Sequence, residues 1–343
     1  MRIVHTLPSD RKARLCIAVL LAALAGLFLL SLAVGRYAVP LSEVVRILVG
    51  KVFPVTPTRD RNMEIAVLNV RLPRILLACL VGCSLAVSGT AYQSVFHNPM
   101  AAPDILGASS GACFGAALAI LLGLPTGGVT VCAFVFSLLT VLIVYFVSTR
   151  TQGNRVVSIL LAGMMTASLF SAGTSCIKLI ADPSSKLPEI TYWLMGSLSG
   201  TGMKDVGFAL IPMLLGMIPL FALRWRLNLL TLGEAEAGTM GVHIGRLRLV
   251  TLLCSTMLTA ASVSVSGMIG WVGLVIPHLC RRLVGNNCRF LIPASMVFGA
   301  VFLLLVDDLS RSLLAVEIPI GILTAFVGAP FFLYLMTGKE RTL

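Results

Sequence analysis

The sequence predicts an all-α membrane protein with about ten transmembrane helices. Its 343 residues are 57% hydrophobic and only 12% charged, and the mean hydropathy is +0.98. A soluble domain of this composition would have too few polar side chains to cover its surface. Apolar runs of about 20 residues, the length that crosses a hydrocarbon core of about 30 Å, recur along the chain. Alternating apolar and polar segments of about ten residues, which indicate a membrane β-barrel, do not occur in the sequence.

The apolar runs divide one transmembrane domain, residues 1–343, into ten predicted spans. The first run follows a cluster of Arg and Lys and resembles a secretory signal, but it is longer than the apolar core of such signals. The eighth run is short and contains Pro277, so we expect a broken or partly re-entrant helix there. The spans are predicted at residues 13–34, 72–94, 102–122, 128–148, 155–179, 206–223, 247–267, 269–280, 290–310 and 319–337.

The distribution of basic residues predicts which ends of the spans are cytosolic. Ten crossings put both termini on one side, and Lys and Arg gather in segments that stay in the cytosol. Fifteen of the 26 basic residues fall on the side of the termini, which carries +10 of the formal net charge of +12. We therefore expect both termini in the cytosol. Because topology accounts for the positive charge and no basic face with stacking aromatics is evident, no nucleic-acid partner is predicted.

A short repeat divides the ten spans into two halves of five. Ala86-Val-Ser-Gly89 precedes Pro99 by ten residues, and Ser264-Val-Ser-Gly267 precedes Pro277 by ten residues. The two blocks fall on the second and seventh spans, and an odd number of crossings per half inverts the second half. Inverted halves are typical of transporters, in which they move about a central path. The alternative is a chance match between helices rich in small residues.

Other polar or small residues in the spans indicate packing and capping. Gly107, Gly111 and Gly115 recur every four residues, a stripe that lets helices approach closely. Asp104 stands at a helix start, where a carboxylate caps free N–H groups, and a proton-carrying site is the alternative. The nine cysteines include no CxxC pair and the four histidines have no His-Glu-x-x-His spacing, so no metal site is predicted.

A polar segment interrupts the apolar chain between the sixth and seventh spans. Residues 232–241 read Leu-Gly-Glu-Ala-Glu-Ala-Gly-Thr-Met-Gly and fall on the predicted cytosolic side. A short amphipathic helix of this kind can bind in a cleft of a partner, and its glycines permit close contact. An ordinary solvated loop is the alternative. The chain has no Gly-x4-Gly-Lys-Ser/Thr phosphate loop, so nucleotide hydrolysis would require another polypeptide.

Several motifs, in their order and spacing, resemble the FecCD-type family, the permease subunits of ABC importers for iron siderophores, haem and cobalamin. They are Arg71-Leu-Pro-Arg74, Asn98-Pro-Met-Ala101, Tyr192-Trp-Leu-Met-Gly196, the segment from Gly270 to His278, and Glu317-Ile-Pro-Ile-Gly321. The resemblance implies a type II ABC importer permease in the cytoplasmic (inner) membrane of a bacterium or archaeon. A second copy or a homologous permease would pair with it, and the path would lie between the two.

The resemblance also implies the remaining partners. Cytosolic ABC ATPases would bind ATP and Mg, and an extracytoplasmic substrate-binding protein would deliver the cargo. This chain itself is expected to bind no cofactor and to contain no catalytic residue. Coupling to the ATPase is assigned to a cytosolic loop at about residues 227–246, through Gly233, Glu234, Ala237, Gly238 and Gly241.

Three arginines match family positions that engage the binding protein. Arg71 and Arg74 lie at the outer end of the second span, and Arg311 lies at the outer end of the ninth. The planar guanidinium binds carboxylates with two parallel hydrogen bonds, which suits docking of an acidic surface. The alternatives are snorkelling to the membrane interface and internal pairing, for example of Arg311 with Asp307 or Asp308.

A cytosolic gate and a path are also assigned by resemblance. Asn98 and Met100 match one part of the gate, and Val156 and Val157 match another, where the family pattern has small hydroxyl residues. The apolar valines indicate a tighter seal. The path is predicted along the fifth span, at Met164, Met165 and Ser168, with ordinary packing as the alternative reading of those three residues.

Three classes of function remain open. The leading hypothesis is ATP-driven import of a metal chelate, an iron siderophore first, with cobalamin, haem or an oxyanion as alternatives. An ion-coupled secondary transporter would need ionisable groups near mid-membrane, and the predicted spans place the acids at helix ends or in loops. A membrane-embedded enzyme would need clustered carboxylates or a zinc motif, which the sequence lacks.

Overall fold

The computed structural model describes residues 10–35, 37–50, 60–151, 155–231 and 243–337, and within these ranges every regular element is a helix. The α-helices are α1 (Asp10–Ala33), α2 (Leu41–Gly50), α3 (Arg61–Ile65), α4 (Leu72–Phe96), α5 (Ala108–Leu121), α6 (Thr126–Arg150), α7 (Arg155–Ile180), α8 (Lys186–Leu194), α9 (Met203–Leu223), α11 (Ile244–Ser266), α12 (Val272–Val284), α13 (Cys288–Ser312) and α14 (Ile320–Thr337). A π-helix, η1 (Ala66–Arg71), joins α3 to α4, and two 3₁₀-helices, η2 (Pro103–Leu106) and η3 (Arg226–Thr231), stand in connections.

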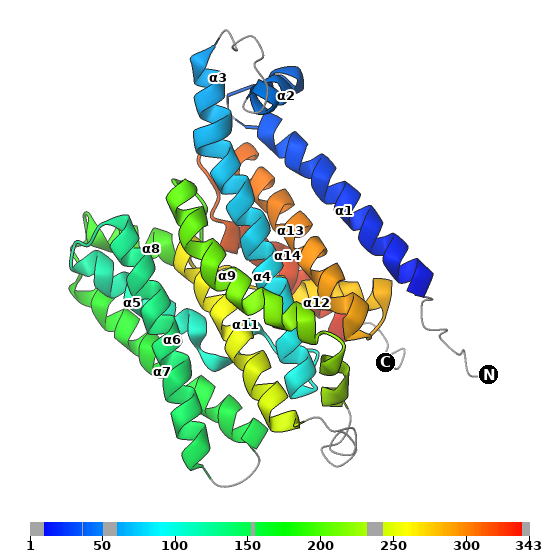
Figure 1. The fold of residues 1–343 in the computed structure, drawn as a ribbon. Coiled ribbons are helices and arrows are strands. Elements are labelled where there is room, and N and C mark those ends of the chain that lie inside the picture. Colours follow the sequence, from blue (N-terminus) through cyan, green and yellow to red (C-terminus); the bar gives the residue numbers. More distant parts are fainter. Residues whose placement is uncertain (1–9, 36, 51–59, 152–154, 232–242, 338–343) are drawn as a thin grey trace.

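Ten of these helices correspond to the ten predicted spans. Among the described residues, seven helical stretches are long and apolar enough to cross a membrane: α1, the continuous α3 to α4 stretch, α6, α7, α9, α11 and α13. The shorter helices α5, α12 and α14 supply the other three. Successive spans run in opposite directions, so α1 begins and α14 ends at the same end of the bundle (Figure 1). We call this the terminal end and the other the opposite end.

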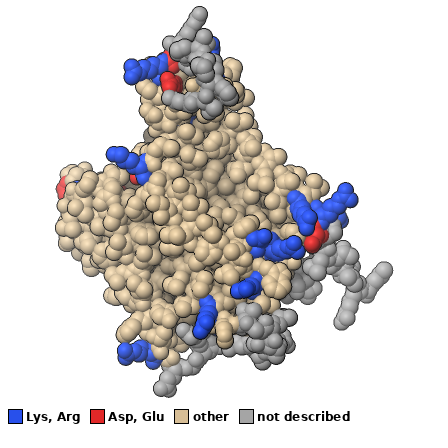
Figure 2. Space-filling model, in the orientation of Figure 1, with Lys and Arg blue, Asp and Glu red and all other residues tan. Residues whose placement is uncertain are grey.

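The charged side chains are distributed as a membrane protein requires. On the face drawn in Figure 2, a broad surface carries no charge. Several Lys and Arg side chains lie along its right and lower edge, and others lie beside acidic side chains at the top and upper left. The terminal end has basic residues at the start of α1, at the end of α6 and at the end of α12. They are Arg11, Lys12, Arg14, Arg150, Arg281 and Arg282. The charge asymmetry in the sequence therefore corresponds to the two ends of the bundle.

The two halves are α1, α4, α5, α6 and α7, followed by α9, α11, α12, α13 and α14. Because each half has five spans, the second is inverted relative to the first. Their central helices, α4 and α11, run antiparallel and are joined by buried hydroxyls. The Ser88 Oγ lies 2.9 Å from both the Ser255 carbonyl oxygen and the Thr259 Oγ1, and the Tyr92 hydroxyl lies 2.9 Å from the Thr256 Oγ1.

Glycines let α4 touch α12 and α13 backbone to backbone. A Cβ atom on Gly89 would lie 1.8 Å from the carbonyl oxygen of Gly273 in α12. A Cβ on Gly82 would lie 2.2 Å from the carbonyl oxygen of Gly299 in α13. Both distances are too short for any side chain, so these two crossings depend on glycine.

The predicted small-residue stripe on α5 is confirmed as a packing surface. A Cβ on Gly111 would lie 1.9 Å from the Thr140 Oγ1 of α6, and a Cβ on Gly115 would lie 2.5 Å from the Cys132 carbonyl oxygen. The predicted cap is also confirmed, because the Asp104 Oδ1 accepts a hydrogen bond of 2.9 Å from the backbone N–H of Ser109 in the first turn of α5.

The eighth span is short, as predicted, but its interruption precedes Pro277. Gly267 and Trp271 have positive φ angles of 66° and 69°, and α12 then runs unbroken through Pro277. A proline inside a helix frees the carbonyl four residues earlier, here that of Gly273. The Gln93 Nε2 of α4 donates to this oxygen at 3.4 Å. A side chain of α4 thus replaces the hydrogen bond that the Gly273 carbonyl loses to the proline, and α12 continues without a break.

The repeated blocks have different local structures despite their matching sequences. α4 continues past Gly89 for seven residues, whereas α11 ends at Ser266 and Gly267 turns the chain. The φ of +66° at Gly267 is one that residues with a Cβ adopt with strain. The inverted halves therefore share their topology, and the repeated residues serve different purposes within it.

The sequence did not predict α2 and α3, two short helices at the opposite end (Figure 1). Asp60 caps α3 by accepting a hydrogen bond of 2.8 Å from the Asn62 N–H, and it also accepts one of 2.6 Å from the Tyr37 hydroxyl. These two donors lower the pKa of the Asp60 carboxyl below its ordinary value. The carboxylate thus ties the chain before α2 to the start of α3.

Candidate translocation and docking sites

The three predicted docking arginines are buried. Arg71, Arg74 and Arg311 are each 6% exposed, near the opposite end of the bundle. The Arg74 Nε lies 2.9 Å from the Asp307 Oδ1, and the Arg74 Nη1 lies 2.9 Å from the Glu317 Oε2. Asp307 is fully buried, so its charge requires a close cation.

Arg311 and Arg71 bind groups of α1 and the segment after it. The Arg311 Nη2 donates to the Ser31 carbonyl oxygen at 2.8 Å and pairs with Asp308, whose other oxygen accepts from the Ser31 hydroxyl at 2.5 Å. The Arg71 Nη1 donates to the carbonyl oxygens of Leu32, at 2.6 Å, and Ala33, at 3.0 Å. Arg311 therefore pairs with Asp308, one of the two internal partners suggested by the sequence.

Together these residues form an ion cluster that joins the two halves. Arg74 and Arg311 pair with three carboxylates, and Arg71 binds backbone carbonyls beside them, so the six side chains together are formally neutral. It connects α1 and α4 of the first half with α13 and the segment before α14 in the second. Docking of a binding protein through these arginines remains a prediction. The cluster consists of Arg71, Arg74, Asp307, Asp308, Arg311 and Glu317.

The predicted gate residues lie at the terminal end, on elements that are in contact. Asn98 and Met100 are exposed in the turn after α4, and the Asn98 Oδ1 accepts from the Met100 N–H at 2.9 Å. Val157, in the first turn of α7, is also exposed. The segment after the turn packs on α7, since a Cβ on Gly163 would lie 2.3 Å from the Ile105 carbonyl oxygen. The side chain of Val156 lies outside the described part.

The predicted path residues share an exposed face of α7. Met164 and Met165 are 58% and 72% exposed, and Ser168 is exposed on the same face. The Ser168 hydroxyl donates to the Met164 carbonyl oxygen at 2.9 Å, so its hydrogen is already used within the helix. This exposure argues against the alternative that the three residues pack in the interior of the chain.

The predicted coupling residues, Gly233, Glu234, Ala237, Gly238 and Gly241, lie outside the described residues, and their role stays a prediction. The structure describes the segment that leads to them. Leu227 and Leu230 of η3 are buried, and the Asn228 side chain bonds to the start of α13. Its Oδ1 accepts from the Cys288 N–H at 2.8 Å, and its Nδ2 donates to the Asn287 Oδ1 at 3.0 Å. The predicted loop therefore begins from an anchored helix at the terminal end.

Sequence reasoning missed the carboxylates that hold Arg74. Asp307 and Glu317 are 233 and 243 residues away along the chain, and no local pattern indicates that pairing. It also missed a cavity of about 330 Å³ at the opposite end, whose lining includes Glu189, Tyr192 and Asp205. Across the described ranges, no three His, Cys, Asp or Glu side chains gather as metal ligands, and all nine cysteines are free thiols.

Comparison with known proteins identifies the architecture. The profile of the FecCD transport family matches residues 21–338. The chain belongs to the FecCD transport family. It is 42% identical over 314 residues to the molybdate import system permease MolB of Haemophilus influenzae, which covers 91% of this chain and 92% of that one. It is 41% identical over 297 residues to the hemin transport system permease HmuU of Yersinia pestis, covering 83% and 87%.

A solved member of the same class has the same fold. The structure of a metal-chelate type ABC transporter in an inward-facing conformation superposes with a TM-score of 0.84 at 40% sequence identity. The match covers 93% of this chain and 98% of the other. The FecCD relatives are transport permeases, so this chain is the membrane-spanning permease subunit of an ABC importer.

Proposed function

We propose that this FecCD permease imports a metal chelate, an iron siderophore first, between two permease copies, driven by a separate ATPase. The observation that carries the path is the exposed face of α7. The opposite face of the same helix is buried against α5 and α6, so α7 is held in place while Met164, Met165 and Ser168 remain uncovered. Thioether and hydroxyl groups bind a large cargo weakly, which a path requires, since the cargo must leave it.

The orientation and coupling follow from the charge distribution. Lys and Arg predominate at the terminal end, and such residues are retained in the cytosol. We therefore propose that the terminal end faces the cytosol and that the residues following η3 bind the ATPase. Cargo would be delivered by a binding protein at the opposite end, in the cytoplasmic membrane of a prokaryote.

A second cargo class is an oxyanion. It is favoured by the 42% identity with the Haemophilus influenzae molybdate permease over almost the whole of both chains. Iron chelate transport is favoured by the 42% identity with a Helicobacter pylori iron chelatin permease over 275 residues, or 80% of this chain. Haem and cobalamin relatives match at 41%. Because the proposed path binds its cargo weakly, the binding protein would select among these cargoes.

The test is uptake into vesicles that contain the permease with its cognate ATPase and binding protein. Radiolabelled ferric siderophores, haem, cobalamin and molybdate would be offered with and without ATP. ATP-dependent accumulation of one of them supports the proposal and identifies the cargo. Accumulation that continues without ATP and stops when an ion gradient is dissipated would instead establish a secondary transporter.

Coupling is tested separately by Glu234→Ala and by Gly238→Trp. Both variants should retain binding-protein affinity while uptake per ATP hydrolysed falls several-fold. Unchanged uptake per ATP in both variants would mean that the segment carrying Glu234 and Gly238 is only a connecting loop. A Gly207→Trp variant on α9, where nothing lies within 4 Å of the added Cβ, serves as the control for bulk on the surface.

A further inference from the structure

An apolar groove of about 400 Å³ opens between α6 and α11 near the terminal end. Its walls are leucines, valines and isoleucine, and its polar side chains are Tyr145, Arg248 and Thr256. Leu142 and Leu253 on its two sides are 59% and 50% exposed, so the groove is open to the surface. Ile159, which contributes from α7, is buried and does not belong to the exposed Met and Ser face of that helix.

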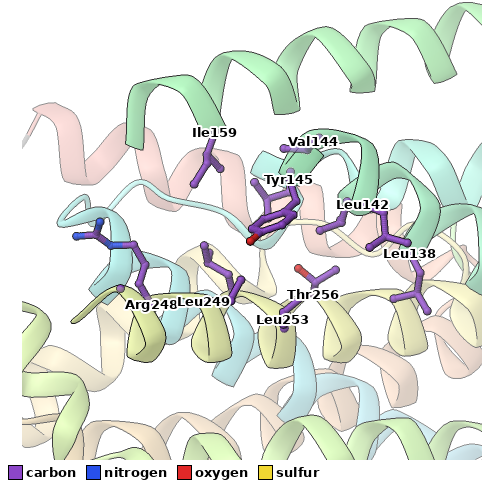
Figure 3. Close-up of a pocket in the computed structure, with 13 residues that line it drawn as sticks. Leu138, Leu142, Val144, Tyr145, Ile159, Arg248, Leu249, Leu253 and Thr256 are labelled. Atoms are coloured by element: carbon purple, nitrogen blue, oxygen red, sulfur yellow. The ribbon is translucent and has the colours of Figure 1, made fainter. Parts of the chain in front are cut away.

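The length and position of the groove match one leaflet of a membrane. Arg248 and Thr256 are eight residues apart on α11, which is about 12 Å at 1.5 Å per residue. Half of a hydrocarbon core is about 15 Å thick. Arg248 lies in the second turn of α11, near the terminal end, and Thr256 lies deeper. In Figure 3, Arg248 stands at one end of the groove, Leu138 at the other, and the Tyr145 hydroxyl points into it.

The polar groups of the groove are arranged for an acidic headgroup. A guanidinium near the hydrocarbon boundary binds phosphate with two parallel hydrogen bonds. Arg246, on the same turn of α11, and Arg150, at the end of α6, add positive charge at the same end of the bundle. The Tyr145 hydroxyl adds a hydrogen-bonding group between the two ends of the groove. The deeper walls are hydrocarbon, which acyl chains match.

We propose that this groove binds an anionic phospholipid from the leaflet at the terminal end. One acyl chain lies between α6 and α11, and the phosphate lies at Arg248. A soluble anion would leave the deep apolar part unfilled, and an uncharged lipid would make no use of Arg248. Because α6 belongs to the first half and α11 to the second, the bound lipid fills the space between the halves at this end and stabilises their contact.

The test is a lipid titration of the purified, delipidated full-length permease followed by native mass spectrometry. Phosphatidylglycerol and phosphatidylcholine with identical acyl chains are the two probes. The expected result is a Kd for phosphatidylglycerol at least about tenfold lower than for phosphatidylcholine. Arg248→Gln should remove that preference while retaining weak binding of both lipids. Gly245→Phe, which places a ring at the mouth of the groove, should weaken both.

Matched variants keep the result interpretable. Nothing lies within 4 Å of a Cβ added at Gly245 or at Gly207, so Gly207→Phe on α9 controls for an added ring. Arg289→Gln at the start of α13 controls for a lost charge at the terminal end. Thermal unfolding of each variant without lipid confirms that it is folded. Equal Kd values for the two lipids in the unaltered protein, or undiminished binding in both groove variants, would overturn the proposal. So would a loss of dimer in Gly245→Phe with unchanged lipid binding, because a second copy would then occupy the groove.

Discussion

The helices α4 and α7 have nearly the same length, 25 and 26 residues, and opposite surroundings. The apolar window of the span that includes α4 is 78% buried, whereas that of α7 is 33% buried. α4 packs against α9, α11, α12 and α13, and α7 packs on one side against α5 and α6. Hydropathy thus selects the helices that enter the membrane, and contacts with distant segments decide which of them becomes the core. Of these two helices, α7 is the one that keeps a face uncovered by the rest of the chain.

The largest effect should come from breaking the ion cluster on α4. Arg74→Gln leaves the fully buried Asp307 without its closest cation, and removing one partner of a buried pair costs about 3–5 kcal/mol. Denaturant unfolding in mixed micelles measures this loss. Adding Asp307→Asn should restore part of it, since the uncompensated charge is then gone. A loss below about 1 kcal/mol in the single variant would mean that the ion cluster contributes little to the stability of the fold.

The next effect should come from the closest helix crossing. Gly89→Ala places a methyl group 1.8 Å from a backbone oxygen of α12, which forces the helices apart. Overpacking of this kind costs about 1–3 kcal/mol. The fraction of monodisperse protein on size exclusion and the unfolding midpoint report the change. Gly207→Ala on α9 is the control, with no loss expected, and equal behaviour of the two variants would contradict the packing argument.

A smaller effect should come from the hydroxyl contact between α4 and α11. Ser88→Ala and Thr259→Val should each destabilise the protein by about 1 kcal/mol. A double-mutant cycle should give a coupling of about 0.6 kcal/mol, the average for hydrogen bonds between membrane helices. Strictly additive losses would show that the contact at 2.9 Å contributes nothing of its own.

The smallest effect on stability should come from α7. Met165→Ala and Ser168→Ala change an exposed face, so the free energy of unfolding should shift by less than about 0.5 kcal/mol. If this face lines the path, ATP-driven uptake in vesicles should nevertheless change several-fold. If a variant of α7 unfolds more readily but transports normally, this face contributes to stability and not to transport, and the proposed difference between α7 and α4 is wrong.

Most of the fold could be predicted from the sequence because membranes impose simple rules. The predicted span 72–94 became α4 and 155–179 became α7, and the charge asymmetry matched the two ends of the bundle. Asp104 was correctly predicted as a cap because capping is local. The eighth span was correctly predicted as short, but the sequence does not show that α12 runs unbroken through Pro277, where Gln93 of α4 donates to the carbonyl freed by that proline.

The candidate sites were less predictable than the fold. Arg71, Arg74 and Arg311 have the residue types that both docking and internal pairing require, and only the tertiary structure brings Asp307 and Glu317 to Arg74. Path residues on α7 were named by resemblance, and their exposure depends on which face of α7 is covered by α5 and α6. The groove beside Arg248 has no sequence signal, because its walls are ordinary leucines and valines brought together from two halves of the chain.

The pairing of Arg74 with Asp307 has a consequence for biosynthesis. The two residues are separated by 233 positions, and translation proceeds at about 5–20 residues per second. The arginine is therefore made about 10–50 s before its carboxylate. For that interval the Arg74 guanidinium lacks its buried carboxylate, and its position near the end of α4 lets water hydrate it. The pair between α4 and α13 can therefore form only after α13 has been synthesised.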